Sequence, residues 1–583
     1  MTSRRTRWLN RWHARRAARA KPATGFTSQP EPRTIGSFAK GRQMVAGNFL
    51  FAGHLVQSPA KSIWTITPPS DDFEAALQDF GWMDDLAAVG DREARARAQY
   101  WTMDWIERFG RGTGPGWVPD VAGRRLIRWI NHAFLILNGQ DSEASQRFHR
   151  SLGQQAIFLS NRWQGRSEEQ GTSPGLPRFE ALTGLIYAGL SLTGMEYLTN
   201  PAMQALAREC DRQIDAAGGI PTRNPEELLE VFTLLNWAAL AIRESDLTPK
   251  PGHQTAIERI APTLRALRHA DGGLARYHGG GRGAEGRLDQ ALATSGVRGG
   301  PTGGPAMGFA RLSAGRTSVI VDADKPPMGA ASWNAHASTL AVEVTSGRRP
   351  LIVNCGSGRQ FGEDWGKAGR ATPSHSVLGL TGVSSSRLGE IESTPYGPRA
   401  RMVEVPNEVE ARKIGDADMI GLVAGHDGYQ PRFGLAYIRR LELAVDGRTI
   451  AGEETLAAVS ESEQATFGRA LEREGEQGVP YNIRFHLHPD VDATIDLGGT
   501  AVSMALKSGE IWVFRYDGAA KLSLEPSVYL EKNRLKPRAS KQVVLSGAAI
   551  DYATRIRWSL AKAQDTPIGV RDLVRDEADE LPD

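Results

Sequence analysis

The chain has 583 residues, of which 40% are hydrophobic and 23% are charged, and its formal net charge at pH 7 is +3. A chain of this length exceeds one ordinary hydrophobic core, so two large domains are expected. The composition is that of a soluble globular protein and excludes an intrinsically disordered one.

Residues 1–30 form a basic N-terminal arm, whose arginines and lysine all precede residue 22 and which has no acidic residue. No apolar stretch in the arm is long enough for a classical signal peptide or a transmembrane segment, so neither is expected. An anionic-surface tether, a nucleic-acid arm and a solvated tail all fit this composition. We favour the solvated tail, because Trp8, Leu9 and Trp12 make only a weak apolar face, and we expect no nucleic-acid partner.

Residues 31–275 are predicted to form a helical domain, because apolar positions from about Asp72 onward recur at helical spacing. The clearest helix follows Asp120, which suits an N-cap, and stops at Asn138-Gly139. Asp141 suits the N-cap of the next helix. Later helices are expected at 178–194, 202–217, 225–243 and 254–269. Short connectors between such helices favour stacked antiparallel hairpins.

A glycine-rich stretch at residues 276–308 is predicted to be a linker or loop, and it lacks the strand and helix that a nucleotide-binding loop needs. Residues 309–565 then change to short strands, which Gly, Asp and Pro separate about every ten residues. The strands are expected at 318–321, 340–344, 439–443, 482–486 and 510–514. This pattern predicts a large antiparallel β-sandwich as a second domain, followed by an acidic tail at 566–583.

Only two cysteines occur, Cys210 and Cys355, and they lie in different halves of the chain. Two such distant residues do not make a disulfide framework. We therefore expect both to be buried thiols.

Three nitrogen-bearing side chains stand at the ends of predicted strands in the second domain, namely His336, Asn354 and His375. Side chains at the ends of neighbouring strands can converge on one point, as in a metal site or a catalytic corner. The alternative is a buried histidine that a hydrogen bond satisfies, because His336 shares a predicted strand face with aliphatic residues.

Charged residues also stand at the starts of two predicted helices. Arg223 and Glu227 flank Asn224-Pro225, which reads as an N-cap, a proline at N1 and a capping-box glutamate at N3. Arg178 stands at the start of another helix in the same way. These residues either cap and position helices or face a substrate.

Residues 335–340, 351–356, 374–377, 426–429 and 485–489 together resemble the heparinase II/III family of polysaccharide lyases. The resemblance covers most of the chain and is strongest from His336 to Pro489. It implies an incomplete α/α toroid of helical hairpins followed by a large antiparallel β-sandwich, with a substrate cleft between them. It also implies a carbon–oxygen lyase that acts on an acidic polysaccharide at the cell envelope or in the periplasm. The missing signal peptide alone would favour the cytoplasm.

Lyases of this family cleave uronic-acid-containing polysaccharides by β-elimination. This chemistry requires a neutralised carboxylate, a base that removes the C5 proton and an acid that protonates the departing O4. The resemblance implies catalytic roles for polar and titratable residues at or near the family's motif positions: Arg178, Arg223, Glu227, Asn334, His426 and Tyr429. Arg178 and Arg223 would hold the uronate by bidentate contacts, and Glu227 stands where the family has a catalytic tyrosine. His426 and Tyr429 lie in a predicted turn, for which simple turn chemistry is the alternative.

The resemblance further implies a zinc ion. His336 and His375 match the family's two histidine ligands, while Asn354 stands where the family usually has aspartate and Asn334 replaces a further histidine. Asparagine is neutral and binds zinc more weakly than a carboxylate does. A non-catalytic glycan-binding or envelope polysaccharide assembly protein with the same fold is therefore the alternative function. A hydrolase is less favoured, because no pair of carboxylates stands out.

Overall fold

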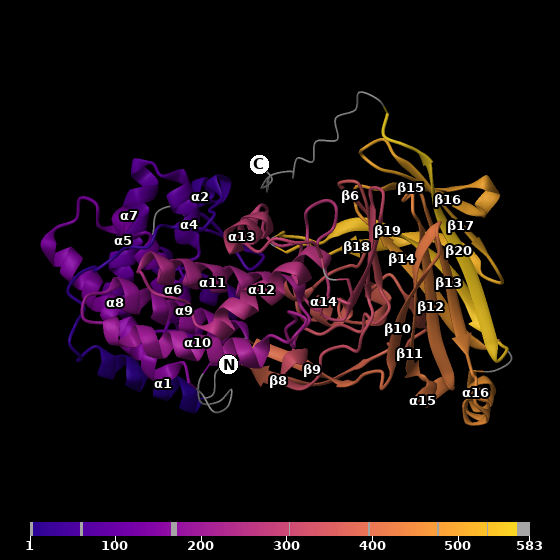
Figure 1. Ribbon diagram of the computed structural model, residues 1–583, viewed down its shortest axis with the longest axis horizontal. Helices are drawn as coiled ribbons and strands as arrows, with labels where there is room; N and C mark the ends of the chain where they lie inside the picture. Colours follow the sequence, from indigo (N-terminus) through magenta and orange to yellow (C-terminus); the bar gives the residue numbers. More distant parts are fainter. Residues whose placement is uncertain are drawn as a thin grey trace.

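The computed structural model describes residues 4–58, 62–164, 172–301, 303–394, 397–474, 477–532 and 534–567. A helical half and a β-rich half lie side by side along the longest axis of the molecule (Figure 1). Within these residues, no helix is both long enough and apolar enough to cross a membrane. Most of the predicted acidic tail, residues 568–583, lies outside the described residues.

The first half is a succession of helices. They are α1 (Arg4–Ala17), α2 (Phe38–Val45), α3 (Asp71–Gln78), α4 (Trp82–Val89), α5 (Arg92–Phe109), α6 (Pro119–Asn131), α7 (Ala133–Leu137), α8 (Ser142–Arg162), α9 (Leu176–Ser191), α10 (Thr199–Gln213), α11 (Pro225–Glu244), α12 (Pro251–Ala266) and α13 (Arg287–Ser295). A small hairpin, β1 (Asn48–Phe51) and β2 (His54–Gln57), lies between α2 and α3. The four later helices expected from the sequence correspond to α9 to α12.

Helix starts follow the sequence signals, with one exception. Asp141 caps α8, because its side chain accepts a 2.7 Å hydrogen bond from the amide of Ala144. The N-cap predicted at Asp120 is wrong: the N-cap is Val118, and α6 begins with Pro119 at N1, since proline needs no amide partner there. The helix expected to run on to Asn138 is also interrupted, at His132.

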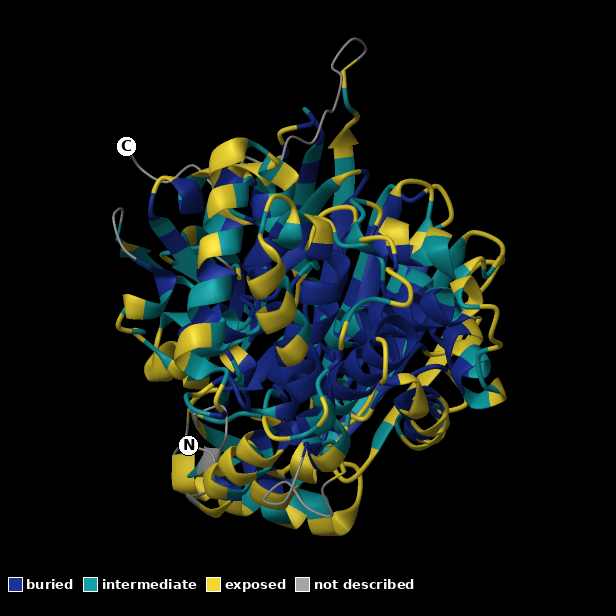
Figure 2. Ribbon diagram, turned by 90° about the vertical axis from the view of Figure 1, so that its left-hand side faces the viewer, coloured by how far each residue is buried: buried dark blue, intermediate teal, exposed yellow. Residues whose placement is uncertain are grey.

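Large aromatic residues and close backbone contacts hold the helices together. Trp101, Trp105 and Trp129 are fully buried. Helices α6 and α9 approach at Gly123 and Gly184, where a Cβ on Gly184 would lie 2.7 Å from Cα of Gly123. Seen from the helical end, buried residues fill the centre of the molecule, and exposed ones form its rim (Figure 2).

The expectation that the N-terminal arm is a solvated tail is wrong, because part of the arm forms helix α1, which packs on α8. Arg162 of α8 donates a 2.8 Å hydrogen bond to Oδ1 of Asn10, and Gln154 donates one of 3.1 Å to the carbonyl of Ala14. The polar residue Asn10 and the small residue Ala14 are both buried against the toroid. The sequence hid this contact because the inner face of the helix carries only small and polar residues, namely Thr6, Asn10, Ala14 and Ala17.

The second half consists of two antiparallel sheets and a small hairpin. One sheet has the order β18-β19-β14-β6-β5-β4-β3, with β7 paired to β14, and the other has the order β10-β11-β12-β13-β20-β17-β16-β15. The strands are β3 (Phe309–Ala314), β4 (Thr317–Asp322), β5 (Val342–Ser346), β6 (Arg349–Val353), β7 (Leu378–Leu380), β8 (Arg387–Thr394), β9 (Gly397–Glu404), β10 (Val409–Gly415), β11 (Met419–Tyr429), β12 (Leu435–Ala444), β13 (Thr449–Ala457), β14 (Val479–Leu487), β15 (Asp492–Asp496), β16 (Ala501–Ala505), β17 (Ile511–Asp517), β18 (Lys521–Tyr529), β19 (Arg538–Ala549) and β20 (Ala553–Gln564). Short helices α14 (Glu363–Ala368), α15 (Gln430–Phe433) and α16 (Glu461–Glu474) lie between strands.

The two large sheets pack face to face. The ring of Phe485 in β14 lies 5.1 Å from that of Phe514 in β17 and 4.8 Å from that of Trp558 in β20. The predicted fold class, a helical toroid followed by an antiparallel sandwich, is therefore confirmed. Cys210 and Cys355 are buried free thiols, as expected.

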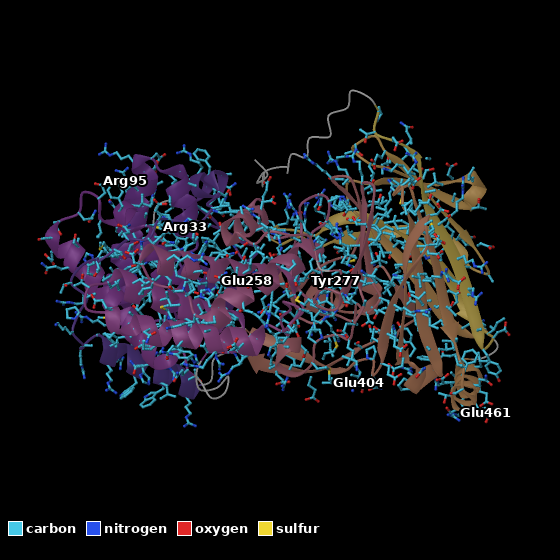
Figure 3. All side chains as sticks on the ribbon, viewed as in Figure 1. Arg33, Arg95, Glu258, Tyr277, Glu404 and Glu461 are labelled. Atoms are coloured by element: carbon cyan, nitrogen blue, oxygen red, sulfur yellow. The ribbon has the colours of Figure 1, made fainter. Side chains whose placement is uncertain are left out.

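Two local expectations are wrong. Residues 334–340 do not open a strand: β5 begins at Val342, and Leu340 before it has a left-handed φ of 66°. The glycine-rich stretch is not a plain linker, because it contains helix α13 and its first residues are buried where the two halves meet. Tyr277 marks this place (Figure 3).

Candidate functional site

The two histidines predicted as metal ligands meet each other. Nδ1 of His336 lies 3.1 Å from Nε2 of His375, and their ring centroids are 5.2 Å apart. Nδ1 of His375 lies 2.9 Å from the carbonyl oxygen of Ala371. A carbonyl can only accept, so Nδ1 of His375 carries the proton, and its Nε2 accepts the hydrogen bond from His336.

A third histidine completes a buried cluster. The backbone amide of His336 donates a 3.1 Å hydrogen bond to Nδ1 of His278, whose Nε2 lies 3.5 Å from a carboxylate oxygen of Asp322. Burial lowers the pKa of His375 to about 4 and holds the pKa values of His278 and His336 well below the ordinary value. All three imidazoles are therefore neutral at neutral pH.

Asn354 belongs to a different set of contacts, which corrects its predicted role as a metal ligand. Its Nδ2 donates to Oε1 of Glu343 at 3.1 Å, and its Oδ1 accepts from the backbone amide of Ser376 at 3.0 Å. Glu343 in turn accepts hydrogen bonds from the ring of His269 and from the amide of Arg276. The amide of Asn354 is thus held by the sandwich core.

The residues present do not fit the zinc site that the family resemblance implies. Two imidazoles remain, and the acidic third ligand is replaced by an amide whose oxygen already accepts a hydrogen bond. Across the described ranges, no group of three or more His, Cys, Asp or Glu side chains is arranged to hold a metal ion.

Arg223 joins the two halves of the molecule. Its guanidinium donates to the carbonyls of Met307, Gly308 and Lys325 and forms a 2.6 Å ion pair with the fully buried carboxylate of Asp322. Its backbone is left-handed, with a φ of 49°. These contacts bind all three nitrogens of the guanidinium to groups of the protein, so the prediction that Arg223 holds a uronate is corrected.

Arg178, near the start of α9, is also engaged. Its Nε donates to the carbonyl of Thr172 at 3.2 Å, and its Nη1 lies 3.4 Å from the buried carboxylate of Glu209. Only 13% of its side chain is exposed. Arg178 therefore compensates a buried acid, and its predicted contact with a substrate carboxylate has no geometric support.

Glu227 lies where the toroid meets the sandwich, in the first turn of α11. Asn224 caps this helix, because its Oδ1 accepts hydrogen bonds from the amides of Glu226 and Glu227 at 3.0 and 3.2 Å. The carboxylate of Glu227 faces Gly175, where a Cβ would lie 3.8 Å from Oε1. Burial raises the pKa of Glu227 to about 7, although Thr222, Lys532 and Arg399 act in the opposite direction.

The neighbouring Glu226 has the opposite electrostatics. It forms an ion pair with Lys532 and accepts a 2.8 Å hydrogen bond from the amide of Gly281. Burial alone would raise its pKa, but Lys532 and this amide lower it below the ordinary value. Asn334 approaches the same loop, because a Cβ added to Gly279 would lie 2.9 Å from the Cβ of Asn334. We call Glu226, Glu227, Asn334 and Lys532 the junction cluster.

His426 and Tyr429 lie inside the sandwich and not in a turn. Both belong to β11, both are buried, and the hydroxyl of Tyr429 donates to the carbonyl of Leu378 at 3.3 Å. Burial lowers the pKa of His426 to about 4 and raises that of Tyr429. Neither residue is placed to transfer a proton to a substrate, which corrects the catalytic role predicted for them.

The sequence reasoning missed the residues that the glycine-rich stretch contributes. Tyr277 donates from its hydroxyl to the carbonyls of Ile320 and Ala341, both 3.0 Å away, and His278 joins the histidine cluster. The signal was a tyrosine and a histidine directly before three glycines. No local signal pointed to Lys532, which comes from the far end of the chain.

The fold and these motifs define a polysaccharide lyase-like protein. Residues 297–559 match the family described as "Heparinase II/III-like, C-terminal". Residues 297–559 therefore carry a domain of that family, and the fold of the whole chain is similar to that of heparinase III.

Solved structures share the whole fold at low sequence identity. The chain superposes on heparinase III with a TM-score of 0.66 and 13% identity, over 95% of this chain and 89% of the other. The heparan sulfate lyase HepC from Pedobacter heparinus gives a TM-score of 0.53 at 14% identity, over 96% of this chain and 88% of the other. Among curated proteins, FtsZ-localized protein C of Caulobacter vibrioides (strain NA1000 / CB15N) is 29% identical over 548 residues, covering 93% of this chain and 91% of that protein.

Proposed function

We propose that this protein binds an envelope glycan at the junction of toroid and sandwich and does not cleave it by uronate β-elimination. One observation carries the proposal: both arginines expected to neutralise a uronate are tied to buried carboxylates, Arg178 to Glu209 and Arg223 to Asp322. β-Elimination requires that neutralisation, because the C5 proton is otherwise too weakly acidic. Withdrawing either arginine would leave a buried carboxylate uncompensated.

The junction cluster supplies the groups that would hold a glycan. Its side chains present two carboxylates, an amide and an ammonium group, from Glu226, Glu227, Asn334 and Lys532. These groups can donate hydrogen bonds to sugar hydroxyls or accept hydrogen bonds from them. Lys532 is exposed, and Glu227 and Asn334 are half-buried, so these groups are accessible to solvent. The relative in Caulobacter vibrioides is named for localisation with FtsZ and not for a reaction, which is in keeping with a non-catalytic role.

A second candidate function, the β-elimination itself, is favoured by Glu227. A carboxyl group with a pKa near 7 is matched to proton transfer at neutral pH. As the base, Glu227 would take the C5 proton while the C4–C5 double bond forms and the C4–O4 bond breaks, and the protonated Glu227 would then return that proton to the departing O4. Lys532 or Arg399 would then have to neutralise the substrate carboxylate.

One set of measurements separates the two candidates. The protein is titrated by calorimetry with N-acetylglucosamine oligomers and with alginate and heparin oligosaccharides, and each mixture is followed by the ultraviolet absorbance of unsaturated uronate. We expect binding of at least one glycan without a rise in absorbance. Asn334→Ala should weaken binding several-fold, whereas Arg440→Ala, on the outer face of the second sheet, should not change it.

Two outcomes would contradict the first proposal. The absence of binding to every glycan would remove it. A rise in absorbance that Glu227→Gln abolishes and Arg440→Ala preserves would establish the lyase instead.

A further inference from the structure

Helix α1 carries two exposed tryptophans in a row of arginines. Trp8 and Trp12 are 62% and 44% exposed, and their spacing of four residues puts them on one face of the helix. Trp8 is the most exposed tryptophan side chain in the described ranges. Tryptophans are rarely left in water without a partner, so this face points to a contact outside the chain.

The same face is strongly cationic. Arg11, Arg15 and Arg16 are exposed, and the guanidinium of Arg16 lies over the ring of Trp12 at 5.5 Å from its centroid. No acidic residue occurs before Glu31, so no side chain of the arm can neutralise these charges. We call Trp8, Trp12, Arg11, Arg15 and Arg16 the arginine–tryptophan face.

The helix is fixed with this face outward. The bonds from Arg162 to Asn10 and from Gln154 to Ala14 lie on the opposite side of the helix, and Gly112 lets a neighbouring turn approach the backbone closely. A Cβ on Gly112 would lie 2.8 Å from the amide nitrogen of Arg15. Helix α1 lies along the lower edge of the helical half (Figure 1).

We propose that the arginine–tryptophan face docks on a membrane surface rich in anionic lipid headgroups. Tryptophan partitions into the headgroup region because its indole is apolar with one polar N–H group, and arginines beside it pair with lipid phosphates. A nucleic acid would also attract the arginines, but exposed tryptophans at helical spacing on a preformed helix suit the apolar boundary of a bilayer better. Because the helix is already folded and attached, docking orients the whole protein on the lipid surface.

The test is co-sedimentation of the full-length protein with vesicles of phosphatidylcholine that contain about 30% phosphatidylglycerol, which gives the vesicle surface the negative charge of an anionic leaflet. We expect binding that falls at least tenfold in Trp8→Ala/Trp12→Ala and is largely kept in Trp8→Phe/Trp12→Phe. Arg11→Gln/Arg15→Gln should also weaken binding, and high salt should weaken binding of the unaltered protein. Phe134→Ala, which removes an exposed aromatic residue from α7, is the matched control and should change nothing.

Three results would overturn the proposal. They are equal binding to vesicles of pure phosphatidylcholine, no effect of the double alanine change, and binding to a DNA duplex that is tighter than binding to vesicles and indifferent to the tryptophans. Thermal unfolding of each variant must match that of the unaltered protein. The phenylalanine pair tests the proposal even if the alanine pair loosens α1.

Discussion

The guanidinium of Arg223 lies 2.6 Å from the carboxylate of Asp322, so that a residue before α11 of the toroid is paired with the last residue of β4 in the sandwich. The same carboxylate accepts a 2.7 Å hydrogen bond from Ser338 and lies 3.5 Å from the ring of His278. Arg223, which was expected to bind the substrate, therefore belongs to the contacts that hold the two halves of the molecule together.

Arg223→Ala is expected to destabilise the protein strongly. Removing one partner of a buried ion pair leaves an uncompensated charge, which costs about 3–5 kcal/mol. Chemical denaturation followed by tryptophan fluorescence measures the change. Arg440→Ala, which breaks the exposed pair with Glu442, should cost no more than about 0.5 kcal/mol. Equal losses in the two variants would show that Asp322 does not depend on Arg223.

Glu227→Gln is expected to stabilise the protein above neutral pH. The folded-state pKa of Glu227 is raised from 4.5 to about 7, so the folded state binds the proton more tightly than the unfolded state does. Stability is therefore lost as pH rises from 4.5 to 7, and the glutamine variant avoids a loss of roughly 1–3 kcal/mol. Thermal unfolding at pH 5 and pH 8 should show a gain that grows with pH.

Glu226→Gln is the matched control with the opposite sign. Lys532 and the amide of Gly281 lower the pKa of Glu226, so its carboxylate contributes stability above pH 4.5 that is lost as pH falls through the folded-state pKa. The glutamine variant should be less stable than the unaltered protein at pH 8 and should approach it at low pH. A gain at pH 8 in this variant would contradict the assignment of the ion pair.

Zinc is not expected to bind stoichiometrically. His336 and His375 offer two neutral nitrogens that already share a hydrogen bond, and Asn354 is held by Glu343 and Ser376. Elemental analysis after incubation with zinc and exhaustive dialysis should give much less than one ion per chain. One ion per chain, lost on His375→Ala, would show that the histidine cluster binds zinc and would contradict this expectation.

Asn224→Ala is expected to weaken both the fold and the proposed glycan site. Losing the hydrogen bonds from the amides of Glu226 and Glu227 should cost about 1 kcal/mol. The first turn of α11 also positions the junction cluster, so glycan affinity should fall as well. Asn224→Asp keeps an acceptor at the N-cap and should restore stability. Unchanged glycan affinity in the alanine variant would show that the N-cap does not position the glycan site.

The fold class could be predicted from the sequence because periodicity is a local property. Helical spacing marked α9 to α12, a run of β-branched residues marked β4, and alternating apolar and polar residues marked β14. The same reasoning gave a wrong prediction for the segment around His336. Its alternation resembles a strand, but the left-handed backbone of Leu340 and the contact between His336 and His278 hold it in another shape.

The candidate site was only partly predictable, because its members come from distant parts of the sequence. The start of α11 identified Glu227 and its cap, since both follow from a short motif. Lys532 pairs with Glu226 across 306 positions, and no periodicity carries that information. The opposite error arose for His426 and Tyr429, which matched a motif but are enclosed between the sheets.

The glycine-rich stretch has a consequence for how the chain can be divided. Arg276 at its beginning donates to the carbonyls of Asn354, Cys355 and Leu530, three sites in the sandwich. A cut after residue 308 would put Arg276 on one fragment and these three carbonyls on the other, so buried groups in both fragments would lose their partners. The two halves are therefore expected to be insoluble when produced separately and to recover a folded state only when they are produced together, as a split protein does.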